Sequence, residues 1–415
     1  MPQRRIVIVG NSAASLAALE SIRRLDGNCP VTLVSDEPIP AYSRVMLPYF
    51  LSGERRDLSL RSPDYYQRMG AQTFLGRRAV RIEPGAVVLD DDTILPFERL
   101  LVATGSHAAI PDIEGVDTPG VFPLKNMADA LRIREHLNGG RQVVILGGGL
   151  ICLLVVRAFR RLGFTVSILV SSDRLLSRML DAEGSALVEQ RLAEAGVRIL
   201  THTDAARIVA RNGRVRSVIT AAGDELPADI VMLAKGIRSN VELARAGGLA
   251  TGRGILVDAY MRTSREGVFA AGDCAEAPDM LVRGKKTISA TWFEAVAQGE
   301  TAGANMLDLA RPSMGSLKMN VMDTLGIAVA AIGLTEAPDA EARVLTRSRD
   351  GVYRKLVISR DRLVGAVLVG DVSEAGPIAM LIRRGVTLSS LKRFNPSRPI
   401  RYAELALQWG PTLSA

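Results

Sequence analysis

The sequence predicts an α/β protein with two parallel-sheet domains of the same kind and a smaller C-terminal α+β domain. A β-turn-α-β unit near the start of the chain recurs 137 residues later, with Gly147 in the place of Gly10. A length of 415 residues exceeds that of one ordinary domain. A joint rich in Pro, Gly and Ser, ARPSMGS near residue 313, separates the last segment.

The first unit consists of a strand, a turn of small residues, a helix and a second strand. RRIVIVG is a short buried strand, GNSAAS is the turn, LAALESIRRL is a helix with an apolar face, and VTLVSDE is a strand ending in acids. The stretch from AVRIEPG to LLVATGS predicts strands and tight turns that return to the first sheet.

The second unit repeats the pattern as RQVVILGGG, LICLLVVRAFRRLG and TVSILVSSD, and a meander and a closing strand follow. GVFAAGDCAE then leads into the helical ATWFEAVAQGETAGANML. Beyond the joint, the hairpin VYRKLVISRDRLVGAVLVG precedes the helix EAGPIAMLIRRG. The predicted boundaries are 1–113 with 238–312 for the first domain, 114–237 for the second and 313–415 for the third.

The cysteines and histidines argue against several kinds of centre. Cys29, Cys152 and Cys274 stand in no paired motif, which argues against a disulfide framework, an iron–sulfur cluster or a dithiol redox centre. They indicate a reducing, cytoplasmic compartment. The three histidines have no metal-site or triad spacing, so we expect no metal site; they are His107, His136 and His202.

Charge and hydropathy limit the partners. The net charge of +8 is concentrated in residues 341–415, which hold 13 Lys/Arg against 6 Asp/Glu. This segment is suited to an acidic partner or to anionic cofactors, or is a solvated or subunit-facing surface. Nucleic acid is not expected, because there is no continuous basic run with interleaved aromatics. No membrane span or signal peptide is expected, since the longest apolar run is too short and the start lacks an apolar h-region.

The turn GNSAAS has the features of a dinucleotide turn. Such a turn needs small side chains, so that backbone N–H groups and a helix N-terminus reach a pyrophosphate. The acids at the end of the second strand are candidates for ribose hydroxyls, although a plain structural turn remains an alternative. The candidate residues are Gly10, Ser12, Ala13, Ala14, Asp36 and Glu37.

Three further elements strengthen this interpretation by their order. LLVATGS ends a strand in a small-residue turn suited to packing against a cofactor. GVFAAGDCAE places a carboxylate after a buried strand and before a helix. There it either accepts a hydrogen bond from a ribityl or ribose hydroxyl or caps that helix. AYSRVMLPY supplies an arginine for pyrophosphate charge. The residues are Ala103, Thr104, Gly105, Gly272, Asp273 and Arg44.

Together, GNSAAS, ATGS, GGGLIC, AKGIRSN and GVFAAGDCAE resemble the two-dinucleotide-binding-domain flavoproteins of the pyridine nucleotide–disulfide oxidoreductase superfamily, over essentially the whole chain. AYSRVMLPYFLSGE and GSLKMNVMDTLG…YRKLVISRDRLVGAVLVGD are most similar to the rubredoxin-reductase, ferredoxin-reductase and nitrite-reductase-flavoprotein branch. Similar flavin subunits serve aldehyde and phenylglyoxylate oxidoreductase complexes.

The resemblance implies two Rossmann-like domains, with FAD on the first and a nicotinamide cofactor on the second. It implies a C-terminal domain for subunit or partner contact. It places Asp273 at the ribityl chain and the helix start at Trp292 near the pyrimidine ring. It also adds Val80 to the FAD site, and Leu150 and Gly236 to the nicotinamide site.

The chain departs from its relatives beside the flavin. Relatives with disulfide, sulfenate or persulfide chemistry need a cysteine within the segment that corresponds to 40–49, and none stands there. Cys274 is expected to be a buried structural thiol, so the chemistry must reside in the flavin. Ferredoxin-reductase-like relatives carry a Lys at the position of Tyr49 and a Glu at that of Leu154. We interpret the loss of both charges as a compensated exchange that gives a more apolar wall over the flavin.

The nicotinamide turn is also altered. Gly147 and Gly149 keep the tight turn, Cys152 replaces the third glycine, and Val170 stands where an NAD site offers an acid to the adenosine ribose. Three polar residues follow that are suited to a ribose hydroxyl or a 2′-phosphate: Ser171, Ser172 and Arg174. The choice between NAD and NADP stays open, as does that between a working and an empty second domain.

The sequence therefore predicts an FAD-dependent NAD(P)H:acceptor oxidoreductase that exchanges electrons with an iron–sulfur protein or a metal-cofactor subunit. We expect it to be the flavin subunit of a larger, oligomeric complex. One alternative is an FAD electron-transfer subunit with a non-functional nicotinamide site. Another is an oxygen-using oxidase or monooxygenase, which the lack of an added substrate domain disfavours.

Overall fold

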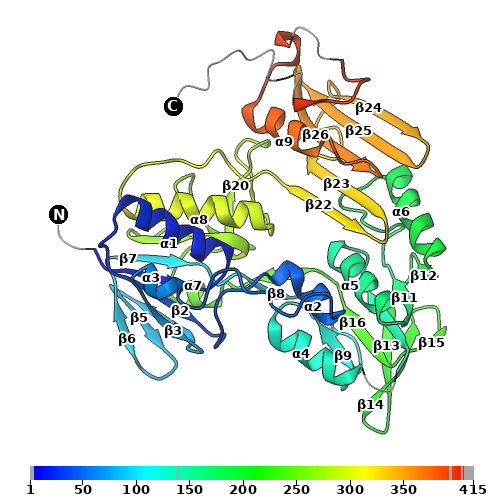
Figure 1. Ribbon diagram of the computed structural model, residues 1–415, viewed down its shortest axis with the longest axis horizontal. Coiled ribbons are helices and arrows are strands. Elements are labelled where there is room, and N and C mark those ends of the chain that lie inside the picture. Colours follow the sequence, from blue (N-terminus) through cyan, green and yellow to red (C-terminus); the bar gives the residue numbers. More distant parts are fainter. Residues whose placement is uncertain (1–3, 138–139, 392–394, 403–404, 406–415) are drawn as a thin grey trace. The chain divides into compact units, whose positions relative to one another are not determined.

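The computed structural model describes residues 4–137, 140–391, 395–402 and 405, and the chain divides into two compact units (Figure 1). The first comprises Met1–Met46, Arg56–His107 and Ile237–Leu317, and the second comprises Leu47–Arg55, Ala108–Gly236 and Lys318–Ala415. Part of the basic segment 341–415 lies outside the described residues, namely 392–394, 403–404 and 406–415.

A parallel five-stranded sheet organises the first unit, in the order β19-β7-β1-β2-β3. Its central strand β1 pairs Ile6 with Val31 on one side and with Arg99 on the other. Short runs of mostly buried, largely aliphatic residues form β1, β2, β7 and β19, as expected where both faces of a sheet are covered, whereas the edge strand β3 is only partly buried. The bounds are β1 (Ile6–Val9), β2 (Val31–Ser35), β3 (Ala71–Leu75), β7 (Arg99–Val102) and β19 (Val268–Ala270).

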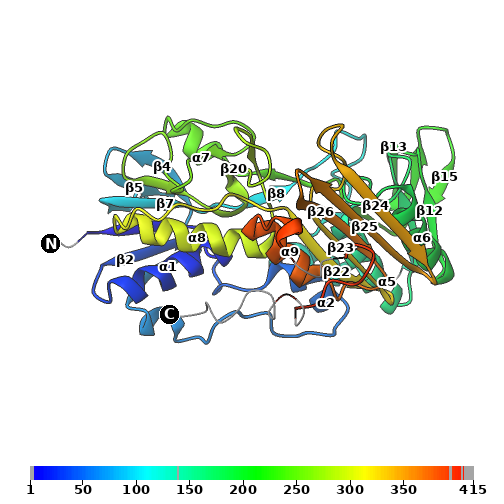
Figure 2. The same ribbon diagram turned by 90° about the horizontal axis from the view of Figure 1, so that it is seen from above.

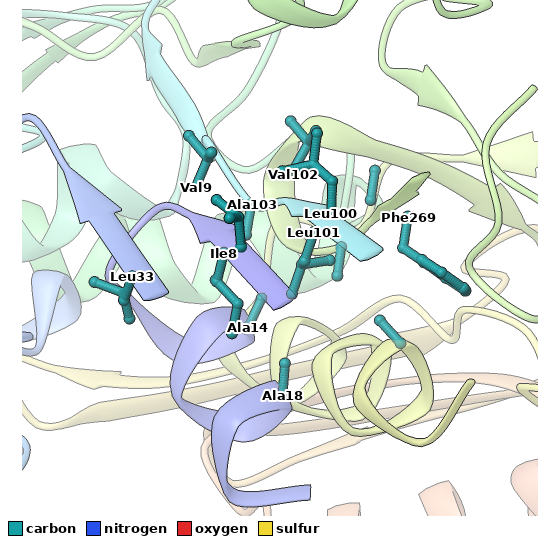
Figure 3. Close-up of a cluster of buried hydrophobic side chains, with 14 of the residues drawn as sticks. Ile8, Val9, Ala14, Ala18, Leu33, Leu100, Leu101, Val102, Ala103 and Phe269 are labelled. Carbon is teal, nitrogen blue, oxygen red and sulfur yellow. The ribbon is translucent and has the colours of Figure 1, made fainter. Parts of the chain in front are cut away.

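Two helices cover one face of this sheet, α1 (Ala13–Leu25) and α8 (Trp292–Met306). Figure 3 shows Ile8, Leu33 and Leu101 in the core beneath them, and each is fully buried. The helices cross closely, since a Cβ at Gly299 of α8 would lie 2.2 Å from the carbonyl oxygen of Ala14. Small residues at this crossing therefore allow α1 and α8 to pack closely against each other.

Smaller elements complete the first unit. An antiparallel sheet contains β4 (Ala79–Glu83), β5 (Ala86–Leu89) and β6 (Ile94–Pro96). The remaining short strands are β8 (Ser106–Ala108), β17 (Ile237–Ser239), β18 (Ile255–Leu256), β20 (Ala275–Pro278) and β21 (Lys286–Thr287). The short helices are η1 (Arg44–Met46), α3 (Tyr65–Arg68), α7 (Glu242–Ala246) and η2 (Gly272–Cys274).

The second unit contains another parallel sheet, in the order β12-β11-β10-β16-β9. Its strands are β9 (Val121–Pro123), β10 (Gln142–Leu146), β11 (Thr165–Leu169), β12 (Val197–Leu200) and β16 (Ile230–Leu233). Its helices are α2 (Leu47–Leu51), α4 (Met127–His136), α5 (Leu150–Arg161) and α6 (Ala182–Glu194). The meander is β13 (Ala205–Arg211), β14 (Arg214–Thr220) and β15 (Glu225–Pro227).

The same unit ends in an antiparallel sheet, in the order β22-β23-β26-β25-β24, on which α9 packs (Figure 2). The strands are β22 (Met319–Thr324), β23 (Ile327–Gly333), β24 (Arg343–Arg349), β25 (Val352–Ser359) and β26 (Arg362–Val369). The helices are α9 (Ala375–Arg384) and η3 (Leu388–Ser390).

The predicted α/β class, the repeated β-turn-α-β unit and the C-terminal α+β part are confirmed. No helix among the described residues has both the length and the apolar character needed to cross a lipid bilayer.

Candidate cofactor sites

The first glycine turn joins β1 to α1. Gly10 has a φ of 124°, and a Cβ there would lie 2.1 Å from the carbonyl oxygen of Ala103. Ser12 is the N-cap of α1 but makes no side-chain capping hydrogen bond. The buried Oγ of Ser15 has no hydrogen-bond partner among the described residues. Uncapped N–H groups and an unsatisfied hydroxyl at one helix start fit an FAD pyrophosphate.

Three other long helices are capped by their own side chains, whereas α9 has no side-chain cap. Asn126, Asp181 and Thr291 each accept a backbone N–H at the starts of α4, α6 and α8. Both helices that follow the glycine turns, α1 and α5, lack such a cap. At α1 and α5 the uncapped start coincides with a glycine turn, and this combination favours ligand binding there over a purely structural role for the turns.

Asp273 lies at the carboxyl end of β19. Its Oδ2 accepts a hydrogen bond from Ser106 Oγ at 2.6 Å, and its carbonyl oxygen accepts one from Ser239 Oγ at 2.6 Å. The neighbouring Gly272 N–H donates to Gln298 Oε1 at 2.8 Å. The prediction of a helix directly after Asp273 is wrong. Gly272 has a φ of 81°, and the chain passes through one 3₁₀ turn into β20.

The ATGS turn is held by a residue whose contact the sequence did not predict. Asn240 Nδ2 donates to the Thr104 carbonyl at 2.7 Å, and Thr104 Oγ1 donates to the Asn240 carbonyl at 2.8 Å. The Asn240 N–H also donates to Gly105 at 3.0 Å. Asn240 ends the AKGIRSN motif, but its partner lies 136 residues away. This contact fixes the backbone that was expected to pack on the cofactor.

Arg44 and Glu37 were expected to hold different parts of a nucleotide, but they form an ion pair with each other. Glu37 also accepts a hydrogen bond from the Tyr42 hydroxyl at 2.6 Å. The two residues are therefore paired with each other in this structure, and their separate roles at a nucleotide stay predictions. Asp36 beside them is exposed.

Trp292 and Val80, both predicted for the FAD site, lie on different elements of the first unit. Trp292 begins α8 and lines a cavity of about 650 Å³ together with Ala13, Val45 and Phe293. Phe293 is 63% exposed. Val80 lies on the separate sheet that contains β4 and is 44% exposed. The structure therefore brings Trp292 to the start of α1, while Val80 stays a prediction.

The second glycine turn joins β10 to α5. Gly147 has a φ of 122°, and a Cβ there would lie 2.3 Å from the Ala234 carbonyl oxygen. Gly149 is the N-cap of α5 and has open space beside it, as has Gly236, whose φ is 96°. Leu150 begins the helix. The turn therefore retains the shape that a nicotinamide nucleotide requires.

The end of β11 differs from the prediction. Val170 is 2% exposed and packs against Gly148, where an added Cβ would lie 2.9 Å from its Cγ1. Ser172 Oγ donates to the Arg174 carbonyl at 2.9 Å. Arg174 pairs with Asp173 and donates from Nε to the Leu180 carbonyl at 3.1 Å. Ser172 and Arg174 are thus both bound within their own loop, and their role at a nucleotide stays a prediction.

Ser171 instead joins a cluster that the sequence did not reveal. Its Oγ donates to Asp204 Oδ1 at 2.9 Å and accepts from Lys235 Nζ at 2.8 Å, while Lys235 also pairs with Asp204. Burial acts to raise the pKa of Asp204, but the hydrogen bonds from Lys235 and Ser171 outweigh it and lower the pKa. The carboxylate is therefore ionised at neutral pH.

Tyr49 and Leu154 are uncharged, but the junction of α2 and α5 is not apolar. Arg157, one turn after Leu154, lies over the Tyr49 ring with Cζ 4.4 Å from the centroid. Its two terminal nitrogens each lie 2.7 Å from a Glu54 carboxylate oxygen. An ion pair therefore stands one helical turn beyond Leu154, while the apolar wall over the flavin at Tyr49 and Leu154 stays a prediction.

We expect Glu54→Gln to lower the free energy of unfolding by about 2 kcal/mol, because Arg157, with a quarter of its side chain exposed, loses its bidentate partner. Arg157 lowers the pKa of Glu54, so the contribution is present above the ordinary glutamate pKa of about 4.3 and is lost as pH falls through the lowered value. Urea unfolding of both proteins at several pH values should show the difference shrinking in acid.

Glu83→Gln is the matched control. The Arg81 and Glu83 side chains are 2.8 Å apart, close to the 2.7 Å between Arg157 and Glu54, but their pair is largely exposed. If Glu54→Gln lowers the free energy of unfolding no more than Glu83→Gln does, the Arg157–Glu54 pair contributes no more stability than an exposed ion pair.

The three cysteines are free and buried. Burial is the main cause that raises the pKa of Cys29, of Cys152 and of Cys274. A buried thiol with a raised pKa is a poor nucleophile. The prediction that Cys274 is a structural thiol agrees with these features, and Cys152, fully buried, packs where a third glycine was expected.

Residues 4–299 match the family described as Pyridine nucleotide-disulphide oxidoreductase, and residues 319–386 match the Rubredoxin NAD+ reductase C-terminal domain. The chain spans about half the length of the first curated relatives it matches, 50% and 52%.

Two other relatives match over most of their length. The ferredoxin--NAD(+) reductase component of the biphenyl dioxygenase system of Paraburkholderia xenovorans (strain LB400) is 34% identical, over 80% of this chain and 82% of the relative. The epsilon subunit of NADH-dependent phenylglyoxylate dehydrogenase of Aromatoleum evansii is 29% identical, over 95% of each.

Among solved structures, the covalent putidaredoxin reductase–putidaredoxin complex matches with a TM-score of 0.86 and 26% identity, over 92% of this chain and 94% of that one.

The family match covers well over half of the residues and agrees with the paired glycine turns. The chain therefore belongs to the pyridine nucleotide-disulphide oxidoreductases, a family whose cofactors are FAD and a nicotinamide nucleotide.

Proposed function

We propose that this chain is an FAD-dependent NAD(P)H oxidoreductase that passes electrons to or from an iron–sulfur protein or a metal-cofactor subunit. We propose that FAD binds to residues 1–113 with 238–312 and the nicotinamide nucleotide to 114–237. Residues 313–415 would serve subunit or partner contact. The free, buried cysteines support a reducing, cytoplasmic setting.

The observation that carries the proposal is the pair of glycine turns, each opening into a helix whose first N–H groups no side chain caps. In the first turn, Gly10 allows the close backbone approach and α1 offers its N–H groups to phosphate oxygens. Ser106 orients the Asp273 carboxylate toward which a ribityl hydroxyl would donate. Gly147 and α5 do the same for the second nucleotide.

The protein's own side chains supply no covalent chemistry in this scheme. The three buried thiols lack the exposure and the lowered pKa of a redox-active cysteine. Bound FAD would supply hydride and single-electron transfer between the nucleotide and the partner. The residues described above bind and orient the two nucleotides.

The names of the relatives and the charge of the C-terminal part support a protein partner. One relative is the ferredoxin reductase component of a dioxygenase system, and another is a subunit of a dehydrogenase. In this chain, β24 is the edge strand of the C-terminal sheet, and it exposes three arginines: Arg343, Arg347 and Arg349. A basic edge of this kind suits an acidic protein surface.

The test is an anaerobic titration of the purified, FAD-loaded protein with NADH and with NADPH, followed by addition of a ferredoxin or of the co-purifying subunit. We expect one nucleotide to bleach the flavin absorbance and the partner to restore it. Failure of both nucleotides to bleach it, even with the partner present, would contradict the proposal.

A second candidate is an FAD electron-transfer subunit whose nicotinamide domain is inert. The buried, apolar Val170 and the Arg174 side chain bound within its own loop favour it, because Val170 offers no polar atom and Arg174 already has partners. In that case the protein would retain FAD, accept electrons from a reduced partner and bind neither NADH nor NADPH.

A further inference from the structure

Three side chains from different loops meet at the carboxyl edge of the second parallel sheet. Ser171 follows β11, Asp204 follows β12 and Lys235 follows β16. Asp204 Oδ1 takes both contacts, from Ser171 at 2.9 Å and from the Lys235 ammonium. Its Oδ2 has no hydrogen-bond partner among the described residues, and half of the side chain is exposed. A rigidly held carboxylate oxygen is thus available to a ligand.

The backbone holds this carboxylate in place. The His202 N–H donates to Ser172 at 2.9 Å and the Thr203 N–H donates to Val170 at 3.0 Å, so the loop after β12 is tied to the loop after β11. The Ala221 N–H donates to the Asp204 carbonyl at 2.9 Å. The position of Asp204 is therefore determined by the sheet and not by an independent loop.

The cluster lies where a dinucleotide domain meets the adenosine ribose. That ribose is bound at the carboxyl end of the second strand of the unit, normally by an acid on that strand. Here the strand ends in Val170, which is buried against Gly148 and offers no polar atom. The hydroxyl of the next residue, Ser171, donates a hydrogen bond to the Asp204 carboxylate. An acid from the loop between β12 and β13 therefore reaches the position next to the missing one.

We propose that Asp204 replaces the missing ribose acid and that its ion pair with Lys235 makes the site select NADH over NADPH. This inference rests on the proposed binding of a nicotinamide nucleotide to this domain. Asp204 Oδ2 accepts a hydrogen bond from a ribose hydroxyl. Lys235 holds Oδ1 and keeps the carboxylate ionised.

Charge balance explains the rejection of a 2′-phosphate. Two cations near this edge are neutralised by neighbouring carboxylates, Lys235 by Asp204 and Arg174 by Asp173. A 2′-phosphate would be placed beside the Asp204 carboxylate and would have to displace it from Lys235. Like-charge repulsion and the loss of an ion pair both oppose that arrangement.

The test measures binding and not turnover. The FAD-loaded wild-type protein and Asp204→Asn are titrated calorimetrically with NAD+ and with NADP+. We expect the wild type to bind NAD+ more tightly. In Asp204→Asn, NAD+ binding should weaken and NADP+ binding should strengthen, because Lys235 is released, so that the affinity ratio shifts by about tenfold or more. Adding Lys235→Gln should remove the gain in NADP+ affinity.

Glu194→Gln is the control, because it breaks a 3.0 Å ion pair with Arg191 on the exposed face of α6 and should leave the ratio unchanged. If the wild type binds NAD+ but Asp204→Asn keeps the same ratio, this inference is wrong while the proposed function stands. The same holds if the wild type prefers NADP+. If the wild type binds neither nucleotide, both are overturned.

Discussion

Gly10→Ala is expected to yield protein without FAD and to destabilise the first unit by at least about 3 kcal/mol. The backbone at Gly10 has a φ of 124°, which L side chains rarely adopt. The added methyl carbon would also stand 2.1 Å from the Ala103 carbonyl oxygen. Either β1 or the ATGS turn must move, and both belong to the proposed FAD site. Flavin content after purification and thermal unfolding measure the effect.

Gly27→Ala is the matched control in the same unit, because Gly27 has open space around it and does not have a left-handed φ. It should retain FAD and unfold at the wild-type temperature. A Gly10→Ala protein with full flavin content and unchanged unfolding would show that the turn is not the FAD site and tolerates a side chain.

The second large effect is expected at Asp181, which joins α6 to the C-terminal sheet within the second unit. Its Oδ2 accepts from the Tyr353 hydroxyl at 2.5 Å and from Lys355 Nζ at 2.8 Å. Asp181→Asn keeps the helix cap but leaves Lys355, whose side chain is 10% exposed, without a counter-ion. We expect a loss of about 3 kcal/mol, measured by urea unfolding. The double variant with Lys355→Met should recover much of it.

The loss should depend on pH. Burial acts to raise the pKa of Asp181, but hydrogen bonds from Lys355 and Tyr353 outweigh it and lower the pKa. The ion pair therefore stabilises the fold above the ordinary aspartate pKa of about 3.9, and this stabilisation disappears as pH falls through the lowered value. Asp350→Asn, in an exposed pair with Arg349, is the control and should have almost no effect. Equal losses for both variants would contradict the prediction.

Features that depend on local spacing were predictable. Gly10 and Gly147 follow aliphatic strands and precede helices, so the turns, the sheets and the family resemblance could be inferred from short windows of sequence. Asp273 was correctly placed at the end of a strand, but the helix after it was not. The positive φ of Gly272 and the pairing of β20 with β18 decide that segment, and the pairing is not local.

The polar contacts of the sites were not predictable to the same degree. Arg157 stands one helical turn after Leu154, and its partner Glu54 is 103 residues away. Asp204 and Lys235 meet Ser171 only because β11, β12 and β16 end at one edge of a sheet. Long polar side chains have many possible partners, and only the folded chain selects among them.

The sequence by itself determined two glycine turns, their order, the lack of a cysteine in the segment 40–49 and the apolar Val170 where the family resemblance predicts an acid. These properties depend on residue type at fixed local spacing. Only the tertiary structure decided that Asp204, from the loop after the neighbouring strand β12, contacts Ser171 beside Val170 and that Lys235 pairs with it. The reason is physical: parallel strands bring their carboxyl ends together regardless of the distance between them in the chain.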